Sequence, residues 1–397
     1  MAYYFIFPEI DTTIYSHPDR KTMNAGADEL LELVKEPGSS DEFHHPSRIL
    51  IKFKNEEITN AISLMGEGTF TSSLSSAVNL QLTLAEANNI VANHIINAYA
   101  VSQSWDEGTG KYLNLPSASN GTSWFFRDNS TFATSWTGSG TATNWFGSAA
   151  TAHGYGTGSI DSTLLTQGGG TWYTGSNFLG TQQFLKGDDL DTNIDVKEII
   201  HRWSASISVG QTFPDGIVNN GFLIKTLDSI EANHTASFGE LQYFSSDTHT
   251  IYPPKLCFKW DDSVQTSAQQ ILAKQGGPLS VLLYGNKKEY NQNEIVKFQI
   301  HVREKYPTRA FTVSSNTLQV GYFTTGSFYS IRDAHTEREV IPFDDNFTKL
   351  SSDVDGMYFN LYMNGLQPER YYRVLFKHIN NFGTTIYDNN YHFKVVR

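Results

Sequence analysis

The sequence has little cysteine, few basic residues and no long apolar run, and each shortage excludes a class of protein. Cys257 is the only cysteine, which excludes an internal disulfide framework and a cysteine-rich zinc site. The 29 Lys and Arg residues are outnumbered by 41 Asp and Glu residues. Because phosphate binding needs basic residues clustered on one face, we expect no nucleic-acid partner. No window holds the ~18 consecutive apolar residues of a membrane-spanning helix, so we expect no membrane insertion.

Long helical periodicities are also scarce, and the charged fraction is low. Charged residues make up 18% of the chain and aromatic residues 13%, a balance typical of an all-β protein with many turns. At 397 residues the chain is long enough for two or three domains. The opening residues, MAYYFIFPEI, have no basic residue and are interrupted by Pro8, unlike a secretory signal. We therefore expect the chain to be made and assembled without export machinery.

Alternating apolar residues predict the strands of the first 260 residues. The segment 47–53 places Ile49, Ile51 and Phe53 on one face. The segment 78–84 alternates apolar and polar side chains over seven residues, which predicts one half-buried strand.

Two short helices are predicted among these strands, over 55–64 and 195–203. Asp195 is expected to cap the second helix at its N-terminus. The spacing of the apolar residues predicts one buried stripe on that helix, formed by Val196, Ile199, Ile200 and Trp203.

Between residues 116 and about 183 the composition shifts to Gly, Ser, Thr and Ala, with recurring aromatic residues. Flexible linkers have few aromatic residues, so this segment is expected to be a loop insertion that folds onto its own rings. The rings have three interpretations: a protein–protein interface, packing over the edge of the domain's own core, or a platform for glycan. The candidate contact residues are Trp124, Phe125, Trp136, Trp145, Trp172 and Tyr173.

The strand pattern lapses over residues 261–277, which predicts a linker between two domains. Short strands separated by turns follow it, and they predict a second β-sandwich, of immunoglobulin or fibronectin type, over 278–397. In that fold the hydroxyl of Tyr371 or Tyr372 is expected to bond back to the preceding turn. The predicted strands are 279–284, 295–302, 318–323 and 371–376.

The first 260 residues contain several short segments in an order found in one β-sandwich family. These segments are 11–14, 47–53, 78–84, 104–108, 194–203, 219–224, 244–246 and 253–256. In this order they resemble the DNRLRE-type jelly-roll module, which occurs in secreted carbohydrate-associated and surface proteins. The resemblance implies a jelly-roll β-sandwich over 1–260. The motif that names the family is absent, and the aromatic-rich insertion after Trp124 departs from its pattern.

Nearly the whole chain also resembles a structural virion protein of tailed bacteriophages, of the T4-like cyanophage type. The segments that carry this resemblance are 3–11, 302–311, 340–344 and 365–373. It implies a component of the neck, tail, baseplate or fibre attachment, assembled with other virion proteins in multiple symmetric copies. It also implies a virion location after synthesis in the host cytoplasm. The alternatives are a carbohydrate-binding module for host-surface glycan and, more remotely, a polysaccharide-degrading enzyme.

No pattern of residues predicts catalysis, and we expect no catalytic residue and no enzyme. Asp106 and Glu107 would suit glycoside hydrolysis only with a further carboxylate across a groove, and the simpler interpretation is a loop whose acids face water. Asp188, Asp189 and Asp191 offer oxygen ligands to calcium but lack the spacing and the glycine of a helix–loop–helix site. We therefore predict no cofactor and no metal, with structural calcium as the alternative at this turn.

Overall fold

A computed structural model describes most of the chain. Strands make up 48% of the described residues and helices 10%, which confirms the predicted all-β class. The described residues are 2–37, 44–65, 76–112, 120–130, 134–136, 168–207, 216–231, 237–265, 278–306, 321–324 and 326–397.

The chain divides into two compact units. The larger unit comprises residues 6–74 and 78–257, and the smaller unit comprises residues 1–5, 75–77 and 258–397. Most of the predicted linker, residues 266–277, lies outside the described residues. The naming of the two domains as a jelly roll and an immunoglobulin-like sandwich stays a prediction.

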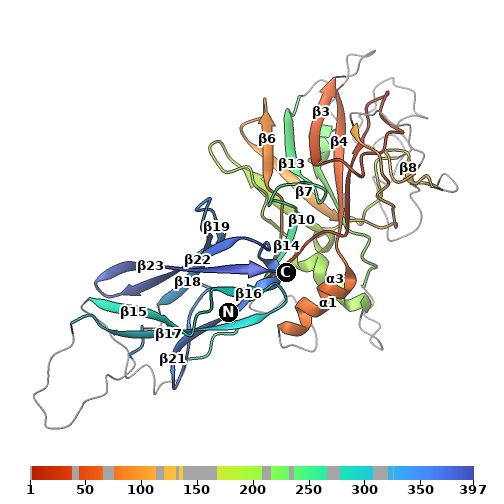
Figure 1. Ribbon diagram of the computed structural model, residues 1–397. Coiled ribbons are helices and arrows are strands. Elements are labelled where there is room, and N and C mark those ends of the chain that lie inside the picture. The colour runs from red at the N-terminus through yellow and green to blue at the C-terminus, as the bar shows by residue number, and fades with distance from the viewer. Residues whose placement is uncertain are drawn as a thin grey trace, which may run out of the picture. The chain divides into compact units, whose positions relative to one another are not determined.

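The larger unit is built on an eight-stranded antiparallel sheet that curls (Figure 1). Seven strands follow one another in the order β10-β7-β12-β4-β3-β13-β6, and β2 pairs with β4 beside this path. The strand β4 pairs with β3 through residues 44–46 and with β2 through residues 47–52, so its partner changes along its length. The strands are β2 (Ile10–Tyr15), β3 (Leu30–Pro37), β4 (His44–Lys52), β6 (Leu84–Asn88), β7 (His94–Ala100), β10 (Leu179–Phe184), β12 (Phe222–Thr226) and β13 (Glu240–Phe244).

The centre of this sheet is buried on both faces. On one face the ring of Phe222 packs against Trp203 and Phe53, with ring centroids 4.7 Å and 6.1 Å apart. Ile49 and Ile51 alternate with Leu50 along β4, and all three are fully buried. The predicted alternation over 47–53 is therefore confirmed. Leu50 points to the opposite face of the sheet, where it belongs to a second buried cluster.

Two of the helices were predicted from sequence and lie side by side, α1 (Asn55–Leu64) and α3 (Lys197–Ile207) (Figure 1). The second helix begins two residues later than predicted, at Lys197, because Asp195 belongs to β11 (Ile194–Asp195). The Asp195 carboxylate still accepts a hydrogen bond from the N–H of Lys197 at 3.0 Å and so satisfies one backbone donor at this end of the helix. The predicted stripe is confirmed, because Val196, Ile199, Ile200 and Trp203 are all buried.

Two segments differ from the sequence predictions. The expected single strand over 78–84 is wrong, because β5 (Ser76–Gln81) ends before Leu82, whose N–H donates to the Thr192 hydroxyl at 2.8 Å. The chain then enters β6 in a different sheet. Residues 179–183, expected in the loop insertion, belong to β10, which pairs with β7 in register from Leu179↔Tyr99 to Phe184↔His94. The four-stranded sheet that holds β5 has the order β1 (Ala2–Ile6), β14 (Lys255–Trp260), β5 and β11 (Ile194–Asp195).

The smaller unit contains two sheets that pack face to face through aromatic rings (Figure 1). The ring of Phe359 stacks on Phe298 of its own sheet at 5.0 Å and on Tyr329 of the other sheet at 4.1 Å. The first sheet has the order β15 (Leu279–Tyr284), β17 (Ile295–Glu304), β21 (Gly356–Tyr362) and β20 (Ser351–Asp353). The second has the order β16 (Glu289–Asn291), β23 (Gly383–Val396), β22 (Tyr371–Asn380), β18 (Ser327–Asp333) and β19 (Glu339–Ile341).

The turn before β22 is fastened by a tyrosine. The hydroxyl of Tyr372, a residue that is 2% exposed, donates to the backbone oxygen of Gln367 at 3.0 Å. The predicted back-bond from Tyr371 or Tyr372 is therefore confirmed, with Tyr372 as the donor.

Candidate functional site

Three of the predicted contact tryptophans lie inside the larger unit. Trp124, Trp136 and Trp172 are between 1% and 3% exposed. For these three rings the burial supports packing onto the core, the second of the interpretations drawn from sequence. The cluster that holds them consists of Ile14, Leu50, Val101, Trp105, Trp124, Trp136, Trp172 and Leu223.

The other predicted contact residues are more accessible. Phe125 is partly buried and packs against the tryptophan cluster. Tyr173 is also partly buried, and its ring lies 5.3 Å from that of Phe178. Trp145 lies outside the described residues. A binding role for the six predicted contact residues therefore stays a prediction. Among the described ones, Phe125 and Tyr173 are the two that are accessible enough to make such a contact.

A buried guanidinium lies beneath two of these rings. Arg48 of β4 is fully buried, and its guanidinium carbon is 4.8 Å from the ring centroid of Trp124 and 5.0 Å from that of Trp172. Its Nη1 donates to the backbone oxygen of Gly169 at 2.5 Å. A cation held over aromatic faces in a dry site is attracted by the ring quadrupoles, so Arg48 joins the rings to the sheet.

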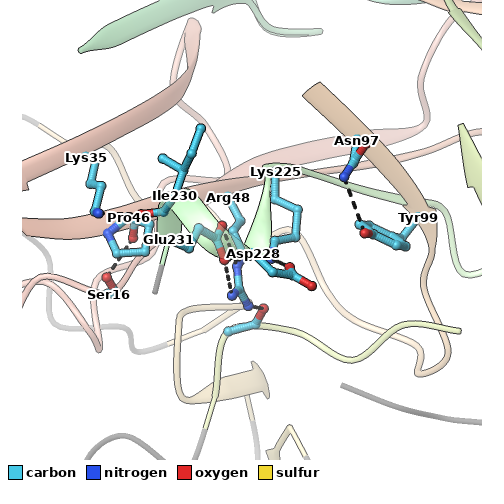
Figure 2. Close-up of polar contacts among 11 residues, drawn as sticks. Ser16, Lys35, Pro46, Arg48, Asn97, Tyr99, Lys225, Asp228, Ile230 and Glu231 are labelled. Carbon is cyan, nitrogen blue, oxygen red and sulfur yellow. Dashed lines mark hydrogen bonds and ion pairs between the residues drawn. The ribbon is translucent and has the colours of Figure 1, made fainter. Parts of the chain in front are cut away.

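Glu231 supplies the opposite charge (Figure 2). Its Oε2 accepts from Arg48 Nη2 at 2.7 Å, and its Oε1 accepts from Arg48 Nε at 3.3 Å. Lys225 of β12 places its Nζ 2.7 Å from Glu231 Oε2 and 2.5 Å from Asp228 Oδ1. The two basic and two acidic groups balance, and the side chains of Arg48, Lys225 and Glu231 have no exposed area.

Burial and charge act in opposite directions on Glu231. Burial alone would raise the pKa of its carboxyl, but the positive charges of Arg48 and Lys225 outweigh burial and hold the pKa below its usual value. Glu231 ends the short helix α4 (Asp228–Glu231), and the backbone oxygen of Ile230 there accepts from Lys35 Nζ. Burial lowers the pKa of Lys35 to about 8. The helix is thus fastened to β3, β4 and β12 by three basic side chains.

A glycine run lies against both Arg48 and Trp124. Gly168, Gly169 and Gly170 all have positive φ, between +80° and +101°. A Cβ on Gly169 would lie 2.5 Å from Arg48 Nη1 and 2.8 Å from the Trp124 ring. Glycine is therefore required here both by the backbone conformation and by the close approach.

The network of Arg48, Lys225, Asp228 and Glu231, called here the buried ion network, has the geometry of a structural contact. Three of its four side chains are without solvent contact, so no substrate reaches them. The network connects β4, β12 and α4 to the segment that carries Trp172. Sequence analysis missed it, although Arg48 and Lys225 stand out as charges within apolar strands.

A second buried feature joins two acids that the sequence separates. The carboxylate of Glu107 accepts a hydrogen bond from the N–H of Asp11 at 2.9 Å, and that of Asp11 accepts from the N–H of Ser246 at 2.7 Å. The Oδ1 atom of Asp11 is buried with no hydrogen-bond partner among the described residues. Burial is the main cause that raises the pKa of both carboxyls to about 7. Asp106 is exposed, as expected, whereas Glu107 is only partly exposed and its carboxylate is bonded to the backbone of Asp11.

The three acids proposed for calcium bind backbone amides. Asp188 accepts from the N–H of Leu185 at 2.8 Å, Asp189 from that of Asp191 at 3.2 Å, and Asp191 from that of Leu84 at 2.7 Å. Among the described residues no group of three or more His, Cys, Asp or Glu side chains is arranged to hold a metal ion.

An open cleft of about 430 Å³ is present in the larger unit. Its aromatic wall is Phe244, whose ring stacks on Tyr252 with centroids 5.8 Å apart. Its polar lining combines both signs of charge. The lining includes Asp28, Glu29, Leu30, Lys111, Phe244 and His249.

Comparisons with known proteins identify no family. No family model matches the chain, and no curated protein matches it significantly. Within the described ranges, no helix is long and apolar enough to span a membrane. Function is therefore argued from the geometry and from the sequence resemblance alone.

Replacing Glu231 with Gln is expected to destabilise the larger unit strongly. The change leaves the Arg48 and Lys225 charges buried without their shared counter-charge, which costs about 3–5 kcal/mol. Urea unfolding followed by tryptophan fluorescence measures the loss, since Trp124 and Trp172 lie beside the network. Glu29→Gln is the matched control, because the pair of Glu29 with His249 is exposed and is expected to leave the midpoint unchanged. Equal midpoints for the two variants would contradict the assigned role.

The Asp11 and Glu107 carboxyls are expected to make stability fall as pH rises. Their pKa values in the folded chain are raised to about 7, above the values of 3.8 and 4.5 for unperturbed groups. The folded state therefore binds protons more tightly than the unfolded state. The free energy of unfolding should rise as pH falls from about 8 to about 5.

Asp11→Asn tests this dependence, because the amide is neutral at every pH. The variant should show a smaller change in the urea midpoint across the same pH range, and Glu29→Gln should follow the wild type. An unaltered pH dependence in Asp11→Asn would contradict the assignment.

Proposed function

We propose that this chain is a non-enzymatic structural protein of a tailed-phage virion and acts through protein–protein interfaces. Its location is the virion, after synthesis in the host cytoplasm, and its partners are other virion proteins in several symmetric copies. The sequence resemblance over 3–11, 302–311, 340–344 and 365–373 suggests the class of protein. In this proposal residues 1–260 form a jelly roll and residues 278–397 an immunoglobulin-like sandwich.

The distribution of exposed apolar side chains carries the proposal. Fourteen large apolar side chains are exposed among the described residues, and ten of them belong to the smaller unit, although that unit is the shorter. Contiguous apolar surface marks interaction sites, and the larger share of these side chains favours the smaller unit as the place of such a surface. These ten residues are Val264, Leu282, Tyr284, Ile295, Tyr306, Val354, Tyr371, Ile379, Phe382 and Ile386.

The proposal moves the main interface away from the aromatic insertion. Trp124, Trp136 and Trp172 are buried, whereas Tyr284 and Val354 of the smaller unit are 67% and 84% exposed. Large exposed apolar side chains that become buried on assembly supply most of the binding energy of an interface. Phe125 and Tyr173 remain candidates for a secondary contact.

Mass spectrometry of purified particles tests the proposal, and it is expected to detect this chain in fixed proportion to the other virion proteins. The double variant Tyr284→Ser and Val354→Ser should lower its incorporation at least tenfold, since a loss of ~1.4 kcal/mol in binding corresponds to tenfold. The matched control is Val91→Ser with Val218→Ser in the larger unit, where both side chains are also exposed. Absence of the chain from purified particles would overturn the proposal.

The open cleft favours a second candidate, a carbohydrate-binding module for host-surface glycan. Sugar rings stack on aromatic faces, and their hydroxyl groups bond to charged side chains. The cleft offers Phe244 for stacking, with Asp28, Glu29 and Lys111 as polar partners.

Titration with host polysaccharide separates the two candidates. If glycan binds in the cleft, Lys111→Ala should weaken binding about tenfold, the effect of losing a charge-assisted hydrogen bond of ~1.4 kcal/mol. Lys186→Ala, at another exposed lysine of the larger unit, is the control. No heat of binding from the wild type would remove this candidate. Reducing ends released during a long incubation would instead favour the remote alternative, a polysaccharide-degrading enzyme.

A further inference from the structure

The outer edge of β23 is open along most of its length. β22 pairs with one side of β23 from Gly383 to Lys394. On the other side β16 pairs in parallel with Lys394, Val395 and Val396 only. In the described part of the chain no strand therefore lies along the outer edge of residues 383–388.

The backbone at this edge points outward at alternate residues. The N–H of Ile379 donates to Gly326, which precedes β18, at 2.7 Å, so the backbone groups of Ile379 and Lys377 face β18. Their partners across the β22–β23 ladder are Thr384 and Ile386. Because pairs in an antiparallel ladder alternate, the N–H and C=O groups of Thr384 and Ile386 face the open edge.

The side chains along this edge favour pairing with another strand. Thr384, Thr385, Ile386 and Tyr387 are uncharged, β-branched or aromatic residues, the types enriched in strands. Ile386 is 55% exposed, and Phe382 in the adjoining turn is 85% exposed. Natural edge strands are usually blunted by charge, proline, a bulge or short length, and none of these devices interrupts residues 383–387.

The remaining edges of the two sheets in the smaller unit are blunted. β16, β19 and β20 have three residues each and each carries an acidic side chain. The edge of β15 is capped, since Asn389 Nδ2 donates to the backbone oxygen of Val281 at 2.7 Å. Among the sheet edges described for residues 278–397, the edge formed by residues 383–388 is therefore the best suited to pair with an added strand.

We propose that this edge pairs antiparallel with the same edge of a second copy of the chain, centred on Ile386. A two-fold axis makes such a contact self-complementary, with the same residues used by both copies. In this register Ile386 faces Ile386 of the second copy, Thr385 faces Tyr387, and Thr384 faces Asp388. This inference rests on the proposed interface role of the smaller unit, and it identifies a second copy of the chain as one partner of that unit.

Charge selects this register and this occupant. Asp388, the nearest charge on the strand, lies opposite a threonine, and its own carboxylate is 3.7 Å from Arg373. A slip of two residues that centred the pairing on Asp388 would set two carboxylates opposite each other, which is destabilising. The bulge at Asn390, a residue with φ of 55°, then ends the regular edge. The paired segment is residues 384–388, about five residues, a common strand length.

Cysteine cross-linking in the full chain tests the proposal. Cys257, the sole natural cysteine, is buried, so a disulfide formed by Ile386→Cys reports contact between two copies at position 386. Directly opposed residues in an antiparallel pair are about 5.5 Å apart at Cα, within the range of a disulfide. Under mild oxidation most of the variant should become a covalent dimer. Ile295→Cys in β17, which is 56% exposed, is the control and should remain mostly unlinked.

Sedimentation gives a second and independent measurement. The wild-type chain should sediment as a dimer, and Ile386→Lys, which sets two ammonium groups opposite each other, should raise the dissociation constant at least tenfold. Ile295→Lys should leave it unchanged. A monomeric wild type, or equal cross-linking at positions 386 and 295, would overturn the pairing. If the pairing fails but the Tyr284 and Val354 double variant still loses incorporation into particles, the proposed function stands. If the wild-type chain is absent from particles, the proposed function is overturned even when the dimer forms.

Discussion

The larger unit depends on the carboxylate of Glu231, which contacts the buried cations of both Arg48 and Lys225 and, together with Asp228, balances their charge. Without it the charges of Arg48 and Lys225 would lie in the centre of a sheet with no solvent to screen them. With it, Arg48 can lie against the rings of Trp124 and Trp172, and the aromatic segment acquires a fixed place over the sheet. The ion pair between Arg48 and Glu231 therefore allows Trp124 and Trp172 to pack as part of the core.

That arrangement explains why the aromatic insertion and the exposed apolar residues play different parts. Among the described residues of the insertion, the rings of Trp124, Trp136 and Trp172 are buried, whereas Phe125 and Tyr173 are partly exposed. The smaller unit builds its core from stacked rings such as Phe298 and Phe359 and still leaves apolar side chains outside. An interface function is therefore better supported by the smaller unit than by the segment richest in tryptophan.

The sequence predicted the elements whose causes are local. The helix over 55–64 has the bounds of α1, and the segment 279–284 those of β15, because periodicity and flanking turns act over a few residues. The pairing of Arg48 with Glu231 joins residues 183 positions apart, and no short pattern encodes such a distance. The burial of Trp124 could not be predicted for the same reason. The end of β5 at Gln81 depends on a hydroxyl from Thr192, which is equally remote.

The order of strands in the curled sheet has a consequence for how the chain folds. β12 inserts between β7 and β4, yet the ribosome makes it long after both. Until Phe222–Thr226 has been synthesised, β4 and β7 each have one unpaired edge rich in isoleucine. Arg48 has no counter-ion until Glu231, five residues further along the chain, has been made. Such long-range pairing folds slowly and exposes intermediates that aggregate. The centre of this sheet therefore cannot close before residue 231 has been made, and β13 is added after it.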